Sequence, residues 1–139
     1  MAKPKNEPPK SKRRKYAPDE VNEHGEYIKI GGSPVPGLTL RHVLRGHTDY
    51  ITRIAWSPDG KYLASPSADK IIRIWNMNTG ECVKALAGHK DVVNDISWAS
   101  NGQSLASCSA DGTVRIWETN TWQFLKLLEG NQEEITCIT

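Results

Sequence analysis

The sequence predicts an all-β fold built from repeated units of four short antiparallel strands. Two stretches, residues 46–79 and 88–121, are similar to each other at an offset of 42 residues, which is the step from Gly46 to Gly88. Within each stretch, short runs of β-branched and aromatic residues alternate with turn-forming residues, a pattern typical of strands that argues against helices. A chain of 139 residues has room for one ordinary domain at most.

Residues 1–37 are predicted to form a disordered arm. They contain six of the eight prolines and lack hydrophobic periodicity, so they cannot bury enough apolar surface to offset the conformational entropy lost on ordering. Residues 1–15 carry a net charge of +6 and residues 16–37 one of −3, whereas residues 38–139 are nearly neutral at −1. The positive charge of the chain therefore lies on the arm.

A basic run in this arm supports three interpretations, which the sequence leaves open. Its cations are Lys10, Lys12, Arg13, Arg14 and Lys15. They are expected to act as a nuclear import signal, to contact nucleic acid phosphates, or to remain a solvated tail. Apart from the flanking Tyr16, no aromatic residue is interleaved with these charges, so stacking on bases is not indicated.

The first complete unit is expected to contain four strands in order. Their predicted ranges are Tyr50–Ser57, Tyr62–Ser67, Ile71–Trp75 and Cys82–Leu86. The turn at residues 57–60 is indicated by Pro58, which sets φ, and by Gly60, which accepts a positive φ. Pro66 is expected inside the second strand, where it removes a ladder donor. An additional outer strand is expected at Thr39–Leu44.

Many residues recur at the offset of 42. The recurring pairs are Gly46/Gly88, His47/His89, Asp49/Asp91, Trp56/Trp98, Gly60/Gly102, Ser65/Ser107, Asp69/Asp111, Arg73/Arg115 and Trp75/Trp117. A Gly-His pair followed by Ser-Ala-Asp and a strand ending in Trp resembles the WD-repeat β-propeller family, whose repeat of roughly 40–45 residues forms one four-stranded blade. The resemblance covers residues 38–139, with units at about 46–87, 88–129 and a partial unit at 130–139.

The sequence departs from the family pattern at three places. Trp75-Asn76 and Trp117-Glu118 replace the Trp-Asp pair, and Gly130-Asn131 replaces Gly-His. A propeller ring needs four to eight blades, so the ring predicted here is incomplete. We expect an N-terminal piece of a longer protein or, alternatively, a short protein that closes a ring by assembling several copies. Downstream blades or other copies are therefore predicted partners.

Ser, His and Asp recur together, and these are the residue types of nucleophilic catalysis. The resemblance implies instead two buried structural tetrads: His47, Ser65, Asp69 and Trp75, and His89, Ser107, Asp111 and Trp117. Duplication favours the tetrads, because a catalytic site needs one copy whereas a blade contact recurs in every blade. No GxSxG motif is present. We therefore predict no catalytic residue and no enzyme.

The remaining sequence features predict neither a cofactor nor a metal site. No Cys/His cluster has metal-ligand spacing, and no glycine-rich loop precedes a helix pattern. No apolar run reaches the roughly 18–20 residues that span a bilayer, so no membrane contact is expected. The three cysteines and the lack of an export signal favour reduced thiols. A cytoplasmic location is predicted, with the nucleus as the alternative because of the basic run.

The leading functional prediction is a protein–protein interaction scaffold. Partner proteins are expected on the loops before the first strand and between the second and third strands. These loops carry Thr48, Tyr50, Thr52, Lys70, Lys90, Val92 and Asn94. One alternative is the sensor propeller of a signalling or effector enzyme with a catalytic domain beyond residue 139. The other is a nuclear or RNA-associated factor, with nucleic acid bound through the basic arm only.

Overall fold

A computed structural model of the chain describes residues 37–130 and 133–139. The chain divides into two compact units, residues 1–40 and 41–139. Of the first unit only residues 37–40 are described, so the predicted disorder of the arm lies outside the described residues. The same holds for its basic run at residues 10–15, and all interpretations of that run stay predictions.

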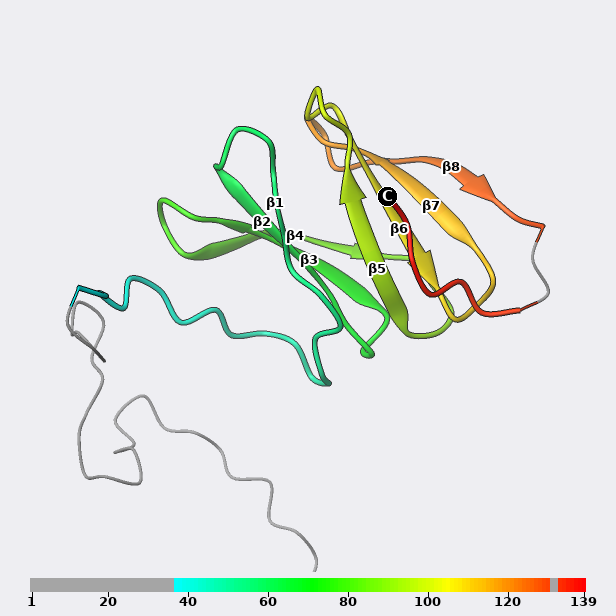
Figure 1. Cartoon of the computed structure of the whole chain (residues 1–139), viewed down its shortest axis with the longest axis horizontal. Helices are drawn as coiled ribbons and strands as arrows, with labels where there is room; N and C mark the ends of the chain where they lie inside the picture. Colours follow the sequence, from blue (N-terminus) through cyan, green and yellow to red (C-terminus); the bar gives the residue numbers. More distant parts are fainter. Residues whose placement is uncertain (1–36, 131–132) are drawn as a thin grey trace, which may run out of the picture. The chain divides into compact units, whose positions relative to one another are not determined.

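Residues 41–139 form two four-stranded antiparallel sheets, each a simple meander in chain order (Figure 1). The first sheet consists of β1 (Ala55–Trp56), β2 (Tyr62–Pro66), β3 (Ile71–Asn76) and β4 (Glu81–Ala87). The second consists of β5 (Val93–Trp98), β6 (Ser104–Ser109), β7 (Val114–Glu118) and β8 (Phe124–Leu128). This arrangement confirms the predicted all-β fold with four strands in each unit.

The turn between β1 and β2 forms as predicted from its proline and glycine. The Ser57 N–H donates to the Tyr62 carbonyl at 2.8 Å, and the Gly60 N–H donates to the Ser57 carbonyl at 2.9 Å. Gly60 has a φ of 70°, as does Gly102 in the matching turn of the second sheet. A residue without a Cβ adopts this left-handed conformation at little cost, so both hairpins close tightly.

The main core lies between the two sheets. The first sheet contributes Ala64, Ile72, Ile74 and Leu86, and the second contributes Val93, Ile96, Leu105 and Trp117. All eight side chains are buried. The two sheets therefore pack face to face, as neighbouring blades of a propeller do.

The structure differs from the strand predictions at four places. β1 is limited to two residues, with one isolated bridge from Ile51 to Ser67, because no described segment covers its outer side. Thr39–Leu44 and the partial unit at 133–139 form no strand, since no strand of either sheet provides them with a ladder partner. Pro66 ends β2 instead of lying inside it, whereas the matching Cys108 lies within β6. A missing N–H explains where β2 ends.

Candidate functional site

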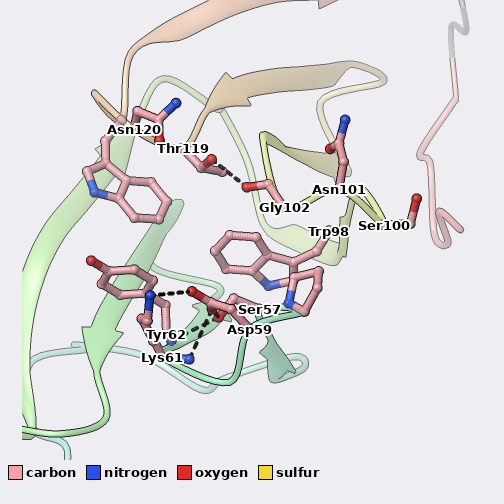
Figure 2. A pocket seen from close by; sticks show the side chains of 12 residues that line it. Ser57, Asp59, Lys61, Tyr62, Trp98, Ser100, Asn101, Gly102, Thr119 and Asn120 are labelled. Carbon is pink, nitrogen blue, oxygen red and sulfur yellow. Dashed lines mark hydrogen bonds and ion pairs between the residues drawn. The ribbon is translucent and has the colours of Figure 1, made fainter.

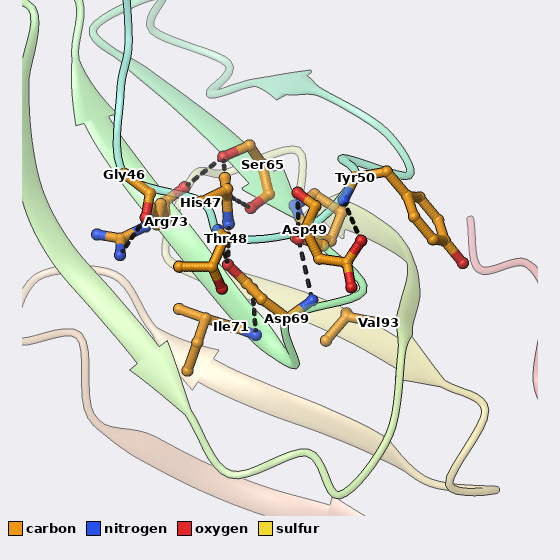
Figure 3. A network of polar contacts seen from close by, with 12 residues as sticks. Gly46, His47, Thr48, Asp49, Tyr50, Ser65, Asp69, Ile71, Arg73 and Val93 are labelled. Carbon is orange, nitrogen blue, oxygen red and sulfur yellow. Dashed lines mark hydrogen bonds and ion pairs between the residues drawn. The ribbon is translucent and has the colours of Figure 1, made fainter. Parts of the chain in front are cut away.

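One hydrogen-bonded network ties the loop before β1 to β2 and β3 (Figure 3). The Trp75 indole N–H donates to the Ser65 hydroxyl at 2.8 Å, and this hydroxyl lies 2.8 Å from His47 Nε2. His47 Nδ1 lies 2.8 Å from an Asp69 carboxylate oxygen. Because an ionised carboxylate only accepts hydrogen bonds, His47 Nδ1 carries a proton and donates it to Asp69. Four side chains thus form one continuous chain of donors and acceptors.

The second blade contains the same network. The Trp117 indole donates to the Ser107 hydroxyl at 2.9 Å, which lies 2.8 Å from His89 Nε2, and His89 Nδ1 lies 3.1 Å from Asp111. The Thr113 hydroxyl adds a further donor to Asp111 at 2.6 Å. The structure therefore brings together all eight residues of the two predicted tetrads, four in each blade.

The two aspartates also hold the loops in place through backbone hydrogen bonds. Asp69 accepts from the N–H of Thr48 at 3.0 Å and of Ile71 at 3.0 Å. Asp111 accepts from the N–H of Lys90 at 2.7 Å and of Thr113 at 3.0 Å. Each carboxylate therefore links the loop at the start of a blade to the turn between its second and third strands.

The electrostatics of the networks follow from burial and hydrogen bonding. Burial raises the pKa of Asp69, but hydrogen bonds from His47 and from the Thr48 and Ile71 N–H groups outweigh it, so that this pKa lies below its ordinary value. Burial likewise raises the pKa of Asp111, and donors led by the Thr113 hydroxyl lower it well below the ordinary range. Burial lowers the pKa of His89, against the opposing effect of Asp111. His89 is therefore neutral at pH 7.

These networks are unsuited to nucleophilic catalysis. The Ser65 and Ser107 side chains are buried, and each hydroxyl already accepts an indole N–H. A substrate carbonyl has no path to either oxygen. What the arrangement can do chemically is to satisfy buried polar groups and fix the loops.

The predicted partner-binding residues fall into two groups. Thr48, Tyr50, Lys70 and Lys90 are exposed and Val92 is half-buried. Tyr50 has 63% of its surface exposed and points away from the network (Figure 3). Thr52 and Asn94 instead connect neighbouring repeats: the Thr52 hydroxyl donates to the Val93 carbonyl at 2.7 Å, and the Asn94 amide donates to the Ile135 carbonyl at 2.9 Å.

Sequence reasoning missed a second set of contacts between repeats. The Val93 N–H donates to the Ser67 carbonyl at 3.2 Å, and the Ile135 N–H donates to the Ser109 carbonyl at the same distance. Arg53 pairs with the buried Asp95 at 2.9 Å. The offset of 42 could have indicated the backbone pairs, because Ser67 and Ser109 are repeat equivalents, whereas nothing in the sequence indicates the ion pair.

The described residues give no indication of a metal site or a membrane segment. Within residues 37–130 and 133–139, no group of three or more His, Cys, Asp or Glu side chains could hold a metal ion. In the same part of the chain, no helix is long and apolar enough to cross a membrane.

Stacked four-stranded sheets with a His, Ser, Asp and Trp network in each define a β-propeller repeat protein. The family model described as "WD domain, G-beta repeat" matches residues 38–76 and 80–118. The chain belongs to this WD-repeat family.

Relatives and solved structures resemble this chain over part of their length. The "Ribosome biogenesis protein BOP1 homolog" of Culex quinquefasciatus is 46% identical over 52 residues, which are 37% of this chain and 6% of that protein. Its Drosophila virilis counterpart is 43% identical over 44 residues, 32% of this chain and 6% of that protein.

Among solved structures, the chain resembles U3-55K, with a TM-score of 0.64, 28% identity and coverage of 66% of this chain and 30% of that one. The RRP9 WD40 repeats match with the same TM-score and identity, over 66% of this chain and 29% of that chain. The chain thus spans less than a third of either solved structure and a small part of its curated relatives.

Proposed function

We propose that this chain is a protein-binding scaffold that acts in ribosome biogenesis, and that its partner contacts the loops at residues 46–50 and 88–92. The WD repeats support a scaffold, and the names of the curated relatives support the process. The observation that carries the proposal is that each tetrad carboxylate fixes a loop N–H next to exposed side chains. Asp69 holds Thr48 near Tyr50, and Asp111 holds Lys90 itself.

The loop surface has the chemistry and rigidity of a protein-binding site. It combines an exposed aromatic ring, Tyr50, with the cations Lys70 and Lys90. The Lys70 ammonium donates to the Lys90 carbonyl at 2.8 Å, which connects the turn between β2 and β3 of the first blade to the loop at 88–92 of the second. Aromatic anchors are enriched in interface hot spots, and loops that are already ordered lose little entropy when a partner binds.

The comparisons support the nuclear alternative over the predicted cytoplasmic location. The names of the curated relatives state a role in ribosome biogenesis for them, and this supports a nuclear location for a scaffold with the same role. The basic run at residues 10–15 is the segment expected to provide import, and it lies outside the described residues.

Binding of protein is favoured over binding of RNA by the repeats themselves. Residues 38–139 carry ten basic and eleven acidic side chains, and nucleic acid binding relies on a surplus of cations. An RNA contact would therefore depend on the arm. A catalytic domain beyond residue 139 stays a prediction.

The test compares loop variants of the tagged full chain in cells. We expect the chain to co-sediment with ribosomal precursor particles from nuclear extract. Tyr50→Ala and Lys90→Glu should each reduce its recovery by about tenfold or more, because hot-spot losses reach about 2 kcal/mol. Lys84→Glu is the matched control, since it reverses the charge of an exposed lysine on β4 and should leave recovery unchanged.

Two results would contradict the proposal. Absence of the chain from precursor particles would exclude the role in ribosome biogenesis. Association that tolerates both loop variants but is lost when residues 1–15 are deleted would move the binding site to the arm.

A further inference from the structure

A pocket of about 560 Å³ lies between the two blades, at the strand ends opposite the loops at 46–50 and 88–92 (Figure 2). Three aromatic rings line it: Tyr62 from β2, Trp98 from β5, and Trp122 from the turn between β7 and β8. The Tyr62 and Trp122 rings are 5.5 Å apart at an angle of 82°, and the Trp98 and Trp122 rings are 6.0 Å apart at 81°. Perpendicular rings of this kind form the walls of a cage.

The cage is not part of the repeat framework. At the offset of 42, Tyr62 corresponds to Ser104 and Trp122 corresponds to Gly80. Only Trp98 has an aromatic equivalent, Trp56. A blade therefore forms without the other two rings, and their presence at this one boundary requires a separate explanation.

Trp122 occupies a backbone conformation that disfavours it. Its φ is 57°, close to the 76° of its equivalent, Gly80. A left-handed conformation costs a residue with a Cβ roughly 1–2 kcal/mol, and for a bulky residue it is an outlier. Strained residues of this kind cluster at functional sites, where surrounding contacts hold them.

Glu118 holds the turn that presents Trp122. Its carboxylate accepts the Asn120 N–H at 3.0 Å, the Thr121 N–H at 2.7 Å and the Thr121 hydroxyl. Glu118 occupies the position at which the family pattern has the Asp of its Trp-Asp pair. The departure from the pattern thus gives the turn a side chain long enough to reach three donors, and the ring of Trp122 is pre-positioned.

The cage has unused capacity for a ligand. Within the described residues, neither the Tyr62 hydroxyl nor the Trp122 indole N–H makes a hydrogen bond, whereas the Trp98 indole donates to the Ala55 carbonyl at 3.2 Å. The one cation that lies over a ring in this part of the chain, Arg115 over Phe124 at 5.2 Å, is outside the pocket. The rings contact one another edge to face, and no described cation lies over the ring surface that lines the pocket.

One carboxylate, Asp59, lies at the rim of the pocket, where it is paired with the ammonium of Lys61. Asp59 accepts the Ser57 hydroxyl at 2.7 Å and the Lys61 N–H at 3.1 Å, and the hydrogen bond from Ser57 holds the pKa of Asp59 below its ordinary value. The Lys61 ammonium lies 3.3 Å from this carboxylate with both side chains exposed. A solvent-exposed ion pair contributes little, so an entering cation can replace Lys61.

We propose that this pocket binds a methylated lysine side chain of a protein partner. Ring faces attract cations, and methylation makes an ammonium easier to remove from water while adding apolar contact with three rings. The rings attract an unmodified lysine as well, but its ammonium is more strongly hydrated and makes less apolar contact with them. The site is separate from the loop surface, so either proposal can fail without the other.

The test measures binding of blocked N-trimethyllysine to the full chain by saturation-transfer NMR, which tolerates self-association of the protein. Blocked lysine and the neutral analogue with a tert-butyl group in place of the trimethylammonium are titrated in parallel. We expect transfer to the N-methyl protons, with affinity at least about tenfold higher than for either comparison compound, because only the methylated cation combines charge with ring contact. Equal affinity for the neutral analogue, or no transfer, would overturn the proposal.

Two matched variants locate the site. Trp122→Gly restores the residue that the first blade has at this position, so the fold should be kept while binding is lost. Trp56→Gly removes the equivalent of Trp98 in the first blade and should leave binding unchanged. Trp122→Phe, which retains a ring, should bind with several-fold lower affinity. Binding that survives Trp122→Gly in a folded chain would exclude the cage.

Discussion

The two blades have the same strand order and the same tetrad, but their first strands differ in how far they are buried. Ile54 in the first blade has 58% of its surface exposed, whereas its equivalent Ile96 in the second has 1%. Ile51 and its equivalent Val93 differ in the same way, at 50% and 0%. Equivalent residues of two similar sequence repeats thus have opposite environments. The residues of the first strand of a blade are therefore buried by the preceding blade and not by their own sheet.

The difference extends to strand formation. β5 spans six residues, five of which pair with β6, and it contacts both β1 and β2 of the first sheet. β1 pairs along two residues and has no described neighbour on its outer side. Ile51, Ile54 and Trp56 lie in or just before β1 and are exposed, so this side of the first sheet presents an apolar face. The need for further blades or copies stays a prediction.

The largest effect is expected from truncating the covered isoleucine. Ile96→Ala should destabilise the chain by about 3 kcal/mol because it leaves a cavity in the core, whereas Ile54→Ala should cost less than about 1 kcal/mol. Urea unfolding of both variants measures the difference. Similar losses would contradict the comparison, since they would mean that another chain covers Ile54 in solution, which light scattering would reveal.

A smaller difference is expected between the two tetrads. Asp111→Ala should cost about 3 kcal/mol and Asp69→Ala about 2 kcal/mol, because each leaves buried donors without an acceptor and Asp111 has one donor more. That additional donor is the Thr113 hydroxyl, whose equivalent in the first blade is Ile71. Thermal unfolding checks the order, and Thr113→Val should remove most of the difference between the blades. An unchanged difference in the Thr113→Val background would show that this hydroxyl is not its source.

The smallest effect is a dependence of stability on pH. The pKa of His89 is lowered in the folded state, so the unfolded chain binds more protons below about 6.5 and stability falls as pH drops through that value. The lowered pKa values of Asp69 and Asp111 add stability above about 3.8 that is lost on further acidification. His89→Gln should flatten the upper part of the curve. Stability that rises as the pH falls from 7 to 5 would contradict this account.

The tetrads could be predicted from the sequence, whereas the extent of the first strand of each sheet could not. His47, Ser65, Asp69 and Trp75 could be predicted to meet because their spacing recurs and each supplies a donor or acceptor that another needs. The length of β1 could not be predicted, since strand formation there depends on a neighbour that the pattern does not contain. For the same reason Thr39–Leu44 has strand-like residues and forms no strand.

The aromatic cage was missed because its rings come from different blades. Tyr62 and Trp122 are 60 positions apart (122 against 62), and no periodicity indicates that they meet. One sequence feature could have drawn attention to them, namely the tryptophan at the position where the preceding unit has Gly80. A bulky residue in place of a turn glycine is a local conflict, and such conflicts mark functional sites.

The hydrogen bonds from Thr52 and Asn94 have a consequence for how such proteins evolve. In both, a side chain of one repeat donates to a backbone carbonyl of the next, Val93 or Ile135. Every residue has a backbone carbonyl, so this contact between repeats requires a side-chain donor on one side only. Both Thr and Asn provide such a donor. A newly duplicated repeat is therefore compatible with its neighbour from the start, before any of its own side chains has adapted.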